Sequence, residues 1–144
     1  MYADCGVERI YRPFRFPYGD RGGSNQAVYQ KYLKEKGFHK VDDTQIDYPW
    51  WKEYSMNVYM DTFWTFDFGE YRIRPDSGFT KESVWERMQN KNPKTGAVLF
   101  AENNHHILLL HAHDETEALV PEYYKLIVDY LLKQGLIFDD PKFL

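Results

Sequence analysis

Apolar residues recur at intervals of three and four positions in three segments of the chain, a pattern typical of amphipathic helices. These segments are residues 25–36, 81–90 and 121–135. Ser24 and Thr80 precede the first two as N-cap residues, and Gly37 and Gly135 mark the ends of the first and third. The pattern therefore predicts three helices. The last is expected to be buried on nearly all sides, because its polar residues form one narrow stripe.

Two further segments have the pattern of β-hairpins. Residues 61–76 alternate between apolar and polar positions, with a turn signal at Gly69. Residues 97–113 consist of two apolar runs separated by Asn103 and Asn104, which favour a turn. We therefore expect an α+β fold, with an antiparallel sheet of four to six strands and about three helices packed on it.

Composition predicts one compact domain, residues 1–144, because 43% of the residues are hydrophobic and 18% aromatic, which excludes intrinsic disorder. Residues 1–23 interleave arginine with aromatic residues, and their proline and glycine content predicts an extended arm or edge strand. The single cysteine excludes an intramolecular disulfide and a multi-cysteine zinc site. Since no run approaches the roughly 20 apolar residues of a membrane helix, we expect a soluble, cytoplasmic protein with no membrane partner.

Charge is distributed unevenly along the chain. Residues 1–40 carry eight Lys and Arg against four Asp and Glu, a balance of +4, whereas residues 41–144 carry ten against eighteen, a balance of −8. This acidic majority argues against wrapping around nucleic acid but leaves a local anion site open. The candidate residues for ligand or nucleic-acid binding are Arg12, Arg15, Arg72 and Arg74. A small-molecule site would place Arg72 and Arg74 in a deep pocket. The structural alternative for the arginines of the arm is that their aliphatic stems cover aromatic rings, and for Arg72 and Arg74 it is an ion pair to Asp67.

Residues 46–61 concentrate aromatic and methionine side chains with little periodicity, as protein-binding surfaces often do. The candidate contact residues are Trp50, Trp51, Tyr54 and Tyr59, and the acidic residues expected to steer a basic partner are Asp42, Asp43 and Asp47. A loop folded over the core is the structural alternative. The leading hypothesis is a small acidic binding protein, without a cofactor, that inhibits or neutralises another macromolecule by occupying its surface, as immunity proteins and phage-encoded inhibitors of host defence do.

Four of the five histidines lie between residues 103 and 115. On a strand, His111 and His113 would share one face about 7 Å apart, close enough to bind one cation, whereas His105 would lie about 20 Å from His111. A third ligand would have to come from elsewhere, and the candidates are His39, Asp61, Asp67 and Glu115. The simpler interpretation is a polar border after a buried strand, with each imidazole bonded to backbone or water.

The motif from His111 to His113, with the Tyr-x-x-Lys spacing of Tyr130 and Lys133, resembles the HUH family of single-strand nickases. The resemblance implies Mn²⁺ or Mg²⁺ held by the histidine pair and Tyr130 as the nucleophile on a DNA phosphate, with Tyr124 as the other candidate. The alternative function is therefore a divalent-metal-dependent single-strand nuclease or phosphodiesterase that acts on nucleic acid. The chain has no Gly-rich phosphate loop, nucleophile elbow or zinc-protease helix, which favours the first hypothesis, a protein that is not an enzyme.

Overall fold

The computed structural model describes residues 10–92 and 95–144. The chain divides into two compact units. The first comprises Met1–Gln45, Pro49–Phe63 and Asp140–Leu144, and the second comprises Ile46–Tyr48 and Trp64–Asp139. The first nine residues of the predicted arm lie outside the described residues.

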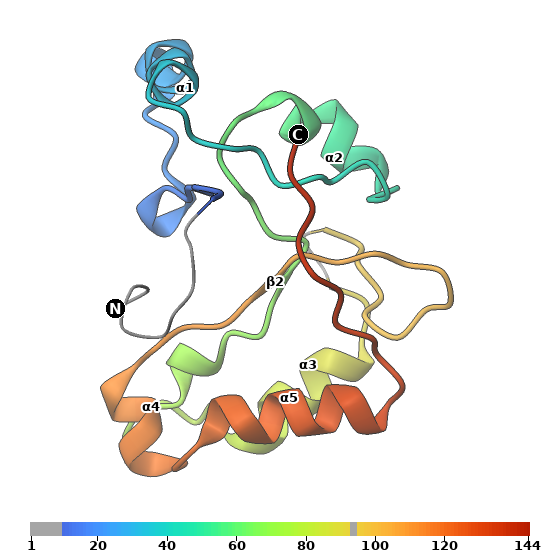
Figure 1. Ribbon diagram of the computed structural model, residues 1–144. Coiled ribbons are helices and arrows are strands. Elements are labelled where there is room, and N and C mark those ends of the chain that lie inside the picture. The colour runs from blue at the N-terminus through green and yellow to red at the C-terminus, as the bar shows by residue number, and fades with distance from the viewer. Residues whose placement is uncertain (1–9, 93–94) are drawn as a thin grey trace. The chain divides into compact units, whose positions relative to one another are not determined.

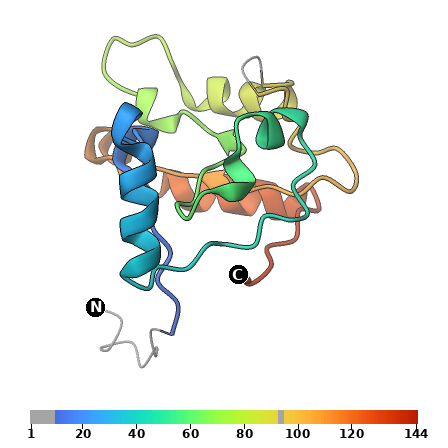
Figure 2. The ribbon, with the colours of Figure 1, turned by 90° about the horizontal axis from the view of Figure 1, so that it is seen from above.

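The first unit combines short helices with irregular chain, and α1 stands out as its longest helix (Figures 1 and 2). Its elements are α1 (Gln26–Glu35), α2 (Pro49–Glu53) and 3-10 turns at Pro17–Gly19, Gly23–Asn25 and Met56–Val58. An isolated antiparallel bridge joins Val41 to Phe143, and the ring of Tyr11 stacks on that of Phe143 with centroids 4.5 Å apart. The described part of the predicted arm, residues 10–23, contains a 3-10 turn and no strand.

Arg21 combines an ion pair with two ring contacts within the first unit. Its Nε donates to Oδ2 of Asp61 at 2.8 Å, and both side chains are nearly buried. Its guanidinium carbon lies 4.7 Å from the ring centroids of both Tyr59 and Phe63, a cation–π arrangement. Gln30 donates to the other carboxylate oxygen of Asp61 at 2.6 Å. Asp61 is thus committed to contacts within this unit.

The described residues of the second unit form a very short parallel sheet and three α-helices. Its elements are β1 (Phe66–Asp67), a 3-10 turn (Glu70–Arg72), α3 (Lys81–Gln89), β2 (Leu108–Leu109), α4 (Asp114–Leu119) and α5 (Tyr123–Lys133). Helices α3 and α5 lie side by side (Figure 1), and Trp85 of α3 stacks on Tyr130 of α5 with ring centroids 5.1 Å apart. The buried core of this unit consists of Phe66, Phe68, Ile73, Val84, Met88, Ala97, Leu99, Tyr123, Ile127 and Leu131.

The three predicted helices are confirmed as α1, α3 and α5. Thr80 is the N-cap of α3, and its backbone N–H donates to Oγ of Ser83 at 3.1 Å in a capping box. Gly37 and Gly135 follow α1 and α5 in left-handed conformation, as C-terminal stop signals do. The prediction for Ser24 is wrong, because the N-cap position of α1 is the next residue.

Helix α5 is less buried than its sequence predicts. It buries one stripe, formed by Tyr123, Ile127 and Leu131. Tyr124 and Leu132 are each 52% exposed. None of the described helices combines the length and the apolar character that crossing a membrane requires.

The predicted antiparallel sheet of four to six strands is wrong. Among the described residues there is one sheet, made of two parallel strands of two residues each. At Gly69, with φ of +69°, the chain enters a 3-10 turn and does not form a hairpin. Phe66 and Phe68 are both fully buried. The aromatic residues alternate here because every second ring inserts into the core, and the segment does not form a long strand.

The second predicted hairpin is also absent, although its turn forms. Asn103 has a φ of +59°, in the left-handed region. The segment after this turn pairs with residues 65–67 instead of folding back on residues 97–101, since the N–H of Thr65 donates to the carbonyl of Ile107 at 2.8 Å. The partner strand therefore comes from a distant part of the sequence, which local patterning does not specify.

Candidate metal centre

Asp67 and His111 come together because β1 and β2 run parallel. Asp67 ends β1 and pairs with Leu109, and His111 follows β2 by two residues. The carboxyl ends of parallel strands meet at one edge of a sheet, where ligand sites commonly form. Gly69 then turns the chain, donating its N–H to Oδ1 of Asp67 at 2.8 Å, and this turn brings Glu70 to the same edge.

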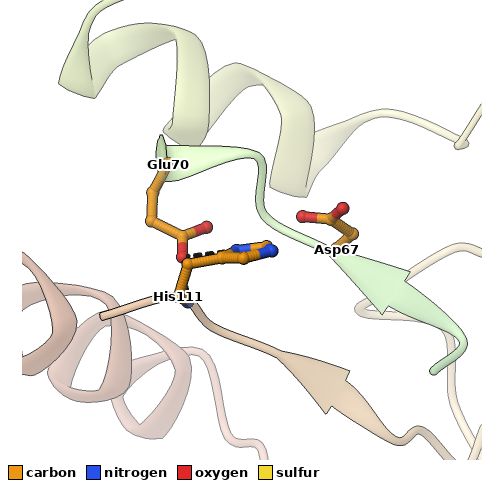
Figure 3. Close-up of side chains that lie close together, drawn as sticks. All are labelled: Asp67, Glu70 and His111. Carbon is orange, nitrogen blue, oxygen red and sulfur yellow. Dashed lines mark hydrogen bonds and ion pairs between the residues drawn. The ribbon is translucent and has the colours of Figure 1, made fainter. Parts of the chain in front are cut away.

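The three side chains converge, as Figure 3 shows. Asp67, Glu70 and His111 each offer one ligand atom, and these atoms lie within 4.8 Å of one another. Donor atoms around one cation bound at about 2.1 Å lie roughly 3 to 4 Å apart, so side-chain shifts of less than about 1 Å would complete a site. One imidazole and two carboxylates suit a first-row divalent cation such as Mn²⁺ or Zn²⁺. Of the four candidates for a third ligand, Asp67 is the one that the structure places in this group with His111.

Glu70 is the deepest member of the group, with 0% of its surface exposed. Its Oε1 accepts the backbone N–H of His111 and lies 3.0 Å from Nδ1 of the same residue. Its Oε2 is buried and has no hydrogen-bond partner among the described residues. Burial raises the pKa of Glu70, opposed chiefly by the hydrogen bond from the His111 backbone. A buried carboxylate oxygen without a donor or a cation is unfavourable.

Glu70 is not among the predicted site residues. Its only sequence signal is an acidic residue in the stretch 63–71, which is rich in aromatic residues and also contains Asp67. Because such a residue usually faces solvent, its burial could be recognised only from the three-dimensional structure.

His111 forms the more accessible side of the group. Its side chain is 29% exposed, and its ring packs against that of Tyr71 with centroids 4.6 Å apart. In Figure 3 the imidazole lies between the carboxylates of Glu70 and Asp67. A cation held here would therefore be anchored on its buried side and reachable by water from the side of His111.

His113 does not share this site, contrary to the predicted histidine pair. The strand ends at Leu109 and α4 begins at Asp114, so His111 and His113 do not alternate along one strand. His113 is the N-cap of α4, and its ring accepts the backbone N–H of Thr116 at 3.3 Å. Its Nε2 lies 3.2 Å from the guanidinium of Arg74. The structure thus gives His113 a capping role and groups His111 with two carboxylates.

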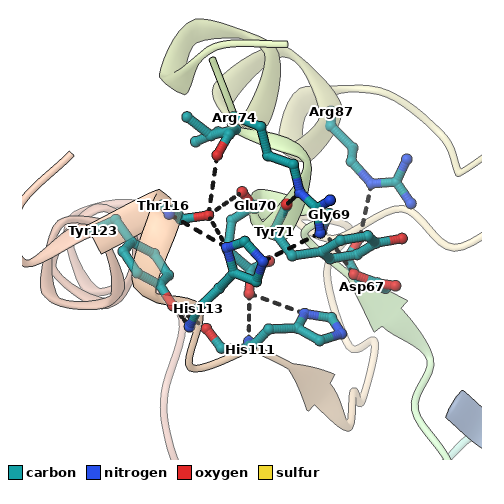
Figure 4. A network of polar contacts seen from close by, with 11 residues as sticks. Asp67, Gly69, Glu70, Tyr71, Arg74, Arg87, His111, His113, Thr116 and Tyr123 are labelled. Atoms are coloured by element: carbon teal, nitrogen blue, oxygen red, sulfur yellow. Dashed lines mark hydrogen bonds and ion pairs between the residues drawn. The ribbon is translucent and has the colours of Figure 1, made fainter. Parts of the chain in front are cut away.

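A hydrogen-bond network fixes the backbone around the group (Figure 4). Oγ1 of Thr116 lies 3.2 Å from the backbone carbonyl of Glu70, to which it can donate. The hydroxyl of Tyr123 donates to the carbonyl of His111 and accepts the N–H of His113. Burial raises the pKa of Tyr123, which keeps this hydroxyl protonated as a donor. Thr116 of α4 and Tyr123 of α5 therefore hold the backbone of Glu70 and His111 in place.

The two candidate nucleophiles lie on α5, outside the group of three. The ring of Tyr130 stacks on Trp85, and its hydroxyl accepts a hydrogen bond from Gln89. These contacts give Tyr130 a packing role between α3 and α5. Tyr124 is exposed, and its ring contacts that of Tyr123.

The candidate arginines of the second unit make local contacts. The guanidinium of Arg72 lies 4.2 Å from the centroid of the Phe79 ring, and Arg74 pairs with Glu115 at 3.5 Å. A small hollow in this unit is lined by Glu70, Lys81 and apolar side chains, and neither Arg72 nor Arg74 lines it. The expected pairing of these arginines with Asp67 is not observed.

The candidate arginines of the first unit are exposed. A terminal nitrogen of Arg12 donates to the carbonyl of Lys36 at 3.1 Å, and its guanidinium carbon lies 4.6 Å from the centroid of the Phe38 ring. Arg15 lies on the same irregular segment. Arg12 thus fits the structural alternative in which an arginine stem covers a ring.

Two predicted protein-contact residues are parts of the core. Trp51 is 1% exposed, and its Nε1 donates to Oδ2 of Asp43 at 2.8 Å. Asp43 also pairs with Lys40 at 2.6 Å and is itself buried. Neither residue contributes to an exposed surface, because both are buried. The other candidates range from half-buried (Trp50, Tyr59 and Asp42) to exposed (Tyr54 and Asp47).

Comparison with family models, with curated proteins and with solved structures gives no match to this chain. The resemblance to the HUH family thus extends no further than its two short motifs. Function has to be argued from the geometry of the chain itself.

Proposed function

We propose that the chain is a divalent-cation-dependent hydrolase whose cation is held by Asp67, Glu70 and His111. The observation that carries this proposal is Oε2 of Glu70, which is buried without a partner within a group of three ligand side chains. A purely structural role for Glu70, in which it accepts the backbone N–H of His111, explains the position of Oε1 but not that of Oε2. A cation accounts for Oε2, the oxygen left without a partner, and for the proximity of Asp67.

Three protein ligands leave coordination positions open for water. A divalent cation supplies Lewis acidity and lowers the pKa of a bound water, which yields a nucleophile near neutral pH. The exposed edge of His111 gives a substrate access to that side of the group. The function class is the alternative predicted from the sequence, with Asp67 and Glu70 in place of His113.

The first test is hydrolysis of bis(p-nitrophenyl) phosphate, a phosphodiester, by chelator-treated protein. We expect a rate that rises on addition of Mn²⁺, returns to background with excess chelator, and is lost in His111→Ala. The substitution keeps the backbone N–H that bonds Glu70, so the fold should be retained. His105→Ala is the matched control, because His105 is exposed and outside the group. An equal rate in His111→Ala and wild type, or no cation-dependent rate in wild type, would contradict the proposal.

A second candidate function is the surface-binding inhibitor. It is favoured by apolar side chains exposed after α5, namely Ile137 at 91% and Phe138 at 51%, and by Tyr54 at 61%. Isolated exposed apolar residues are common on monomers, which makes this support weaker than that of the cation site. The same assay separates the two, since an inhibitor of this kind needs no cation-dependent turnover.

A further inference from the structure

We infer that Arg87 is the anion-binding residue of the site, and that the substrate class is a phosphate ester whose oxygens bridge the cation and this guanidinium. The inference rests on the proposed function, because it adds a substrate contact to the same cation site. Its basis is that Arg87 donates a hydrogen bond to the backbone carbonyl of Asp67 and makes no ion pair with the Asp67 carboxylate.

Arg87 extends from α3 to the edge of the sheet, where its Nε donates to the backbone carbonyl of Asp67 at 2.7 Å. An arginine this close to an aspartate commonly pairs with the carboxylate. Here no ion pair joins the two side chains, although both belong to the described part of the chain. Bonding to the carbonyl leaves the carboxylate of Asp67 available to a cation and the positive charge of Arg87 available to an anion.

The terminal nitrogens of Arg87 make no hydrogen bond to any described residue, and neither is completely buried. Figure 4 shows the guanidinium next to Asp67, linked to the network through Nε alone. The bond through Nε fixes the orientation of the guanidinium plane. A planar guanidinium with its terminal nitrogens open can donate two parallel hydrogen bonds to a phosphate.

Gly69 contributes to this arrangement. A Cβ at Gly69 would lie 3.8 Å from Nε and 3.9 Å from Cδ of Arg87, so the side chain of Arg87 passes directly over the turn that positions Asp67 and Glu70. The neighbouring arginine, Arg74, is engaged by Glu115 and His113. Arg72 also lies near this turn, with its Cδ 3.6 Å from the same Cβ position, but its guanidinium lies over the ring of Phe79. Arg87 differs from both in that a hydrogen bond to the backbone of Asp67 holds it beside a proposed ligand.

The chemistry of this pair selects the ligand. A bound cation and a guanidinium fixed next to one of its ligands would present two positive centres to a tetrahedral oxyanion. Such centres stabilise both a bound phosphate and the charge that develops on it during hydrolysis. A neutral ester or a peptide bond offers no charge to Arg87. Phosphate esters therefore use both centres, whereas neutral esters and peptide bonds use only the cation.

The test measures inorganic phosphate binding to Mn²⁺-loaded protein by the broadening of its ³¹P resonance, with Mn²⁺ affinity measured separately by titration calorimetry. In Arg87→Gln we expect phosphate affinity to fall by at least about tenfold, while Mn²⁺ affinity changes less than about twofold. Arg87→Lys keeps the positive charge and loses the planar guanidinium, so its phosphate affinity should lie between those of wild type and Arg87→Gln. Arg72→Gln is the matched control and should bind phosphate as wild type does, since Arg72 lies over the Phe79 ring.

The outcomes separate this inference from the proposed function. Normal Mn²⁺ binding with unchanged phosphate affinity in Arg87→Gln overturns the role of Arg87 and leaves the cation site intact. A parallel loss of Mn²⁺ and phosphate binding in Arg87→Gln also overturns it, because Arg87 would then act only by positioning Asp67. Absence of Mn²⁺ binding by wild type overturns the proposed function and this inference together.

Discussion

Replacing Glu70 with glutamine is expected to lower the affinity for Mn²⁺ by about 100-fold or more. Glutamine keeps an oxygen that can accept the His111 N–H, but it removes the negative charge and places an amide where Oε2 now lies. Loss of residues that merely orient a metal ligand costs 10- to 100-fold in affinity, and loss of a ligand itself should cost at least as much. Titration calorimetry with chelator-treated protein measures the effect.

The same variant should also lose stabilisation by the cation. At a Mn²⁺ concentration of 100 times the dissociation constant, wild type gains about 2.7 kcal/mol of unfolding free energy by mass action. Glu70→Gln should gain about 0.4 kcal/mol or less at that concentration. Glu86→Gln, an exposed substitution on α3, is the control and should behave as wild type. Equal stabilisation of Glu70→Gln and wild type would show that Glu70 is not a ligand.

Acidification from pH 7 to pH 4.5 is expected to remove about 2 kcal/mol of unfolding free energy through His106 alone. His106 lies in the second unit, with Nδ1 3.1 Å from the hydroxyl of Thr65 and Nε2 3.4 Å from that of Tyr48. Burial lowers the pKa of His106 from 6.5 to about 4. Above pH 6.5 the imidazole is neutral in both states. Below it the unfolded chain takes up the proton first, so stability falls until the pH approaches the folded pKa.

Urea unfolding of wild type and His106→Gln at both pH values measures this contribution. The variant should lose about 2 kcal/mol less than wild type on acidification. His105→Gln is the matched control, because His105 is exposed and adjacent. It should lose nearly as much as wild type, because the charge of His105 lowers the pKa of His106 less than burial does. Equal losses in all three proteins would place the acid sensitivity of the fold in other groups.

The helices were predictable because their signals are local. Caps and stop residues lie within a turn of the helix that they bound, as Thr80 and Gly135 do. The sheet was not predictable, because Phe66 pairs with Leu108, forty-two residues away in sequence. Alternation in the segment around Phe66 suits a strand or an irregular segment that inserts every second ring into the core, and the local pattern does not distinguish them.

The residues of the candidate site also differ in how far the sequence predicted them. His111 was predicted as a metal ligand from its residue type, and Asp67 was one of four open candidates for a third ligand. Their proximity follows from the parallel register, which the expected hairpins excluded. The place of Glu70 in the site could not be predicted, because its side chain is fully buried and glutamate side chains usually lie on the surface. His113 was assigned to the site because strand geometry was extended past Leu109, where the chain in fact turns toward α4.

The most direct test of the cation site is an anomalous difference map from a crystal of the protein grown with Mn²⁺, with data collected near the manganese absorption edge. The account predicts one strong peak within coordination distance of the Glu70 carboxylate, the Asp67 carboxylate and the His111 ring. A map without a peak there, in crystals whose Mn²⁺ concentration far exceeds that of the protein, would contradict it.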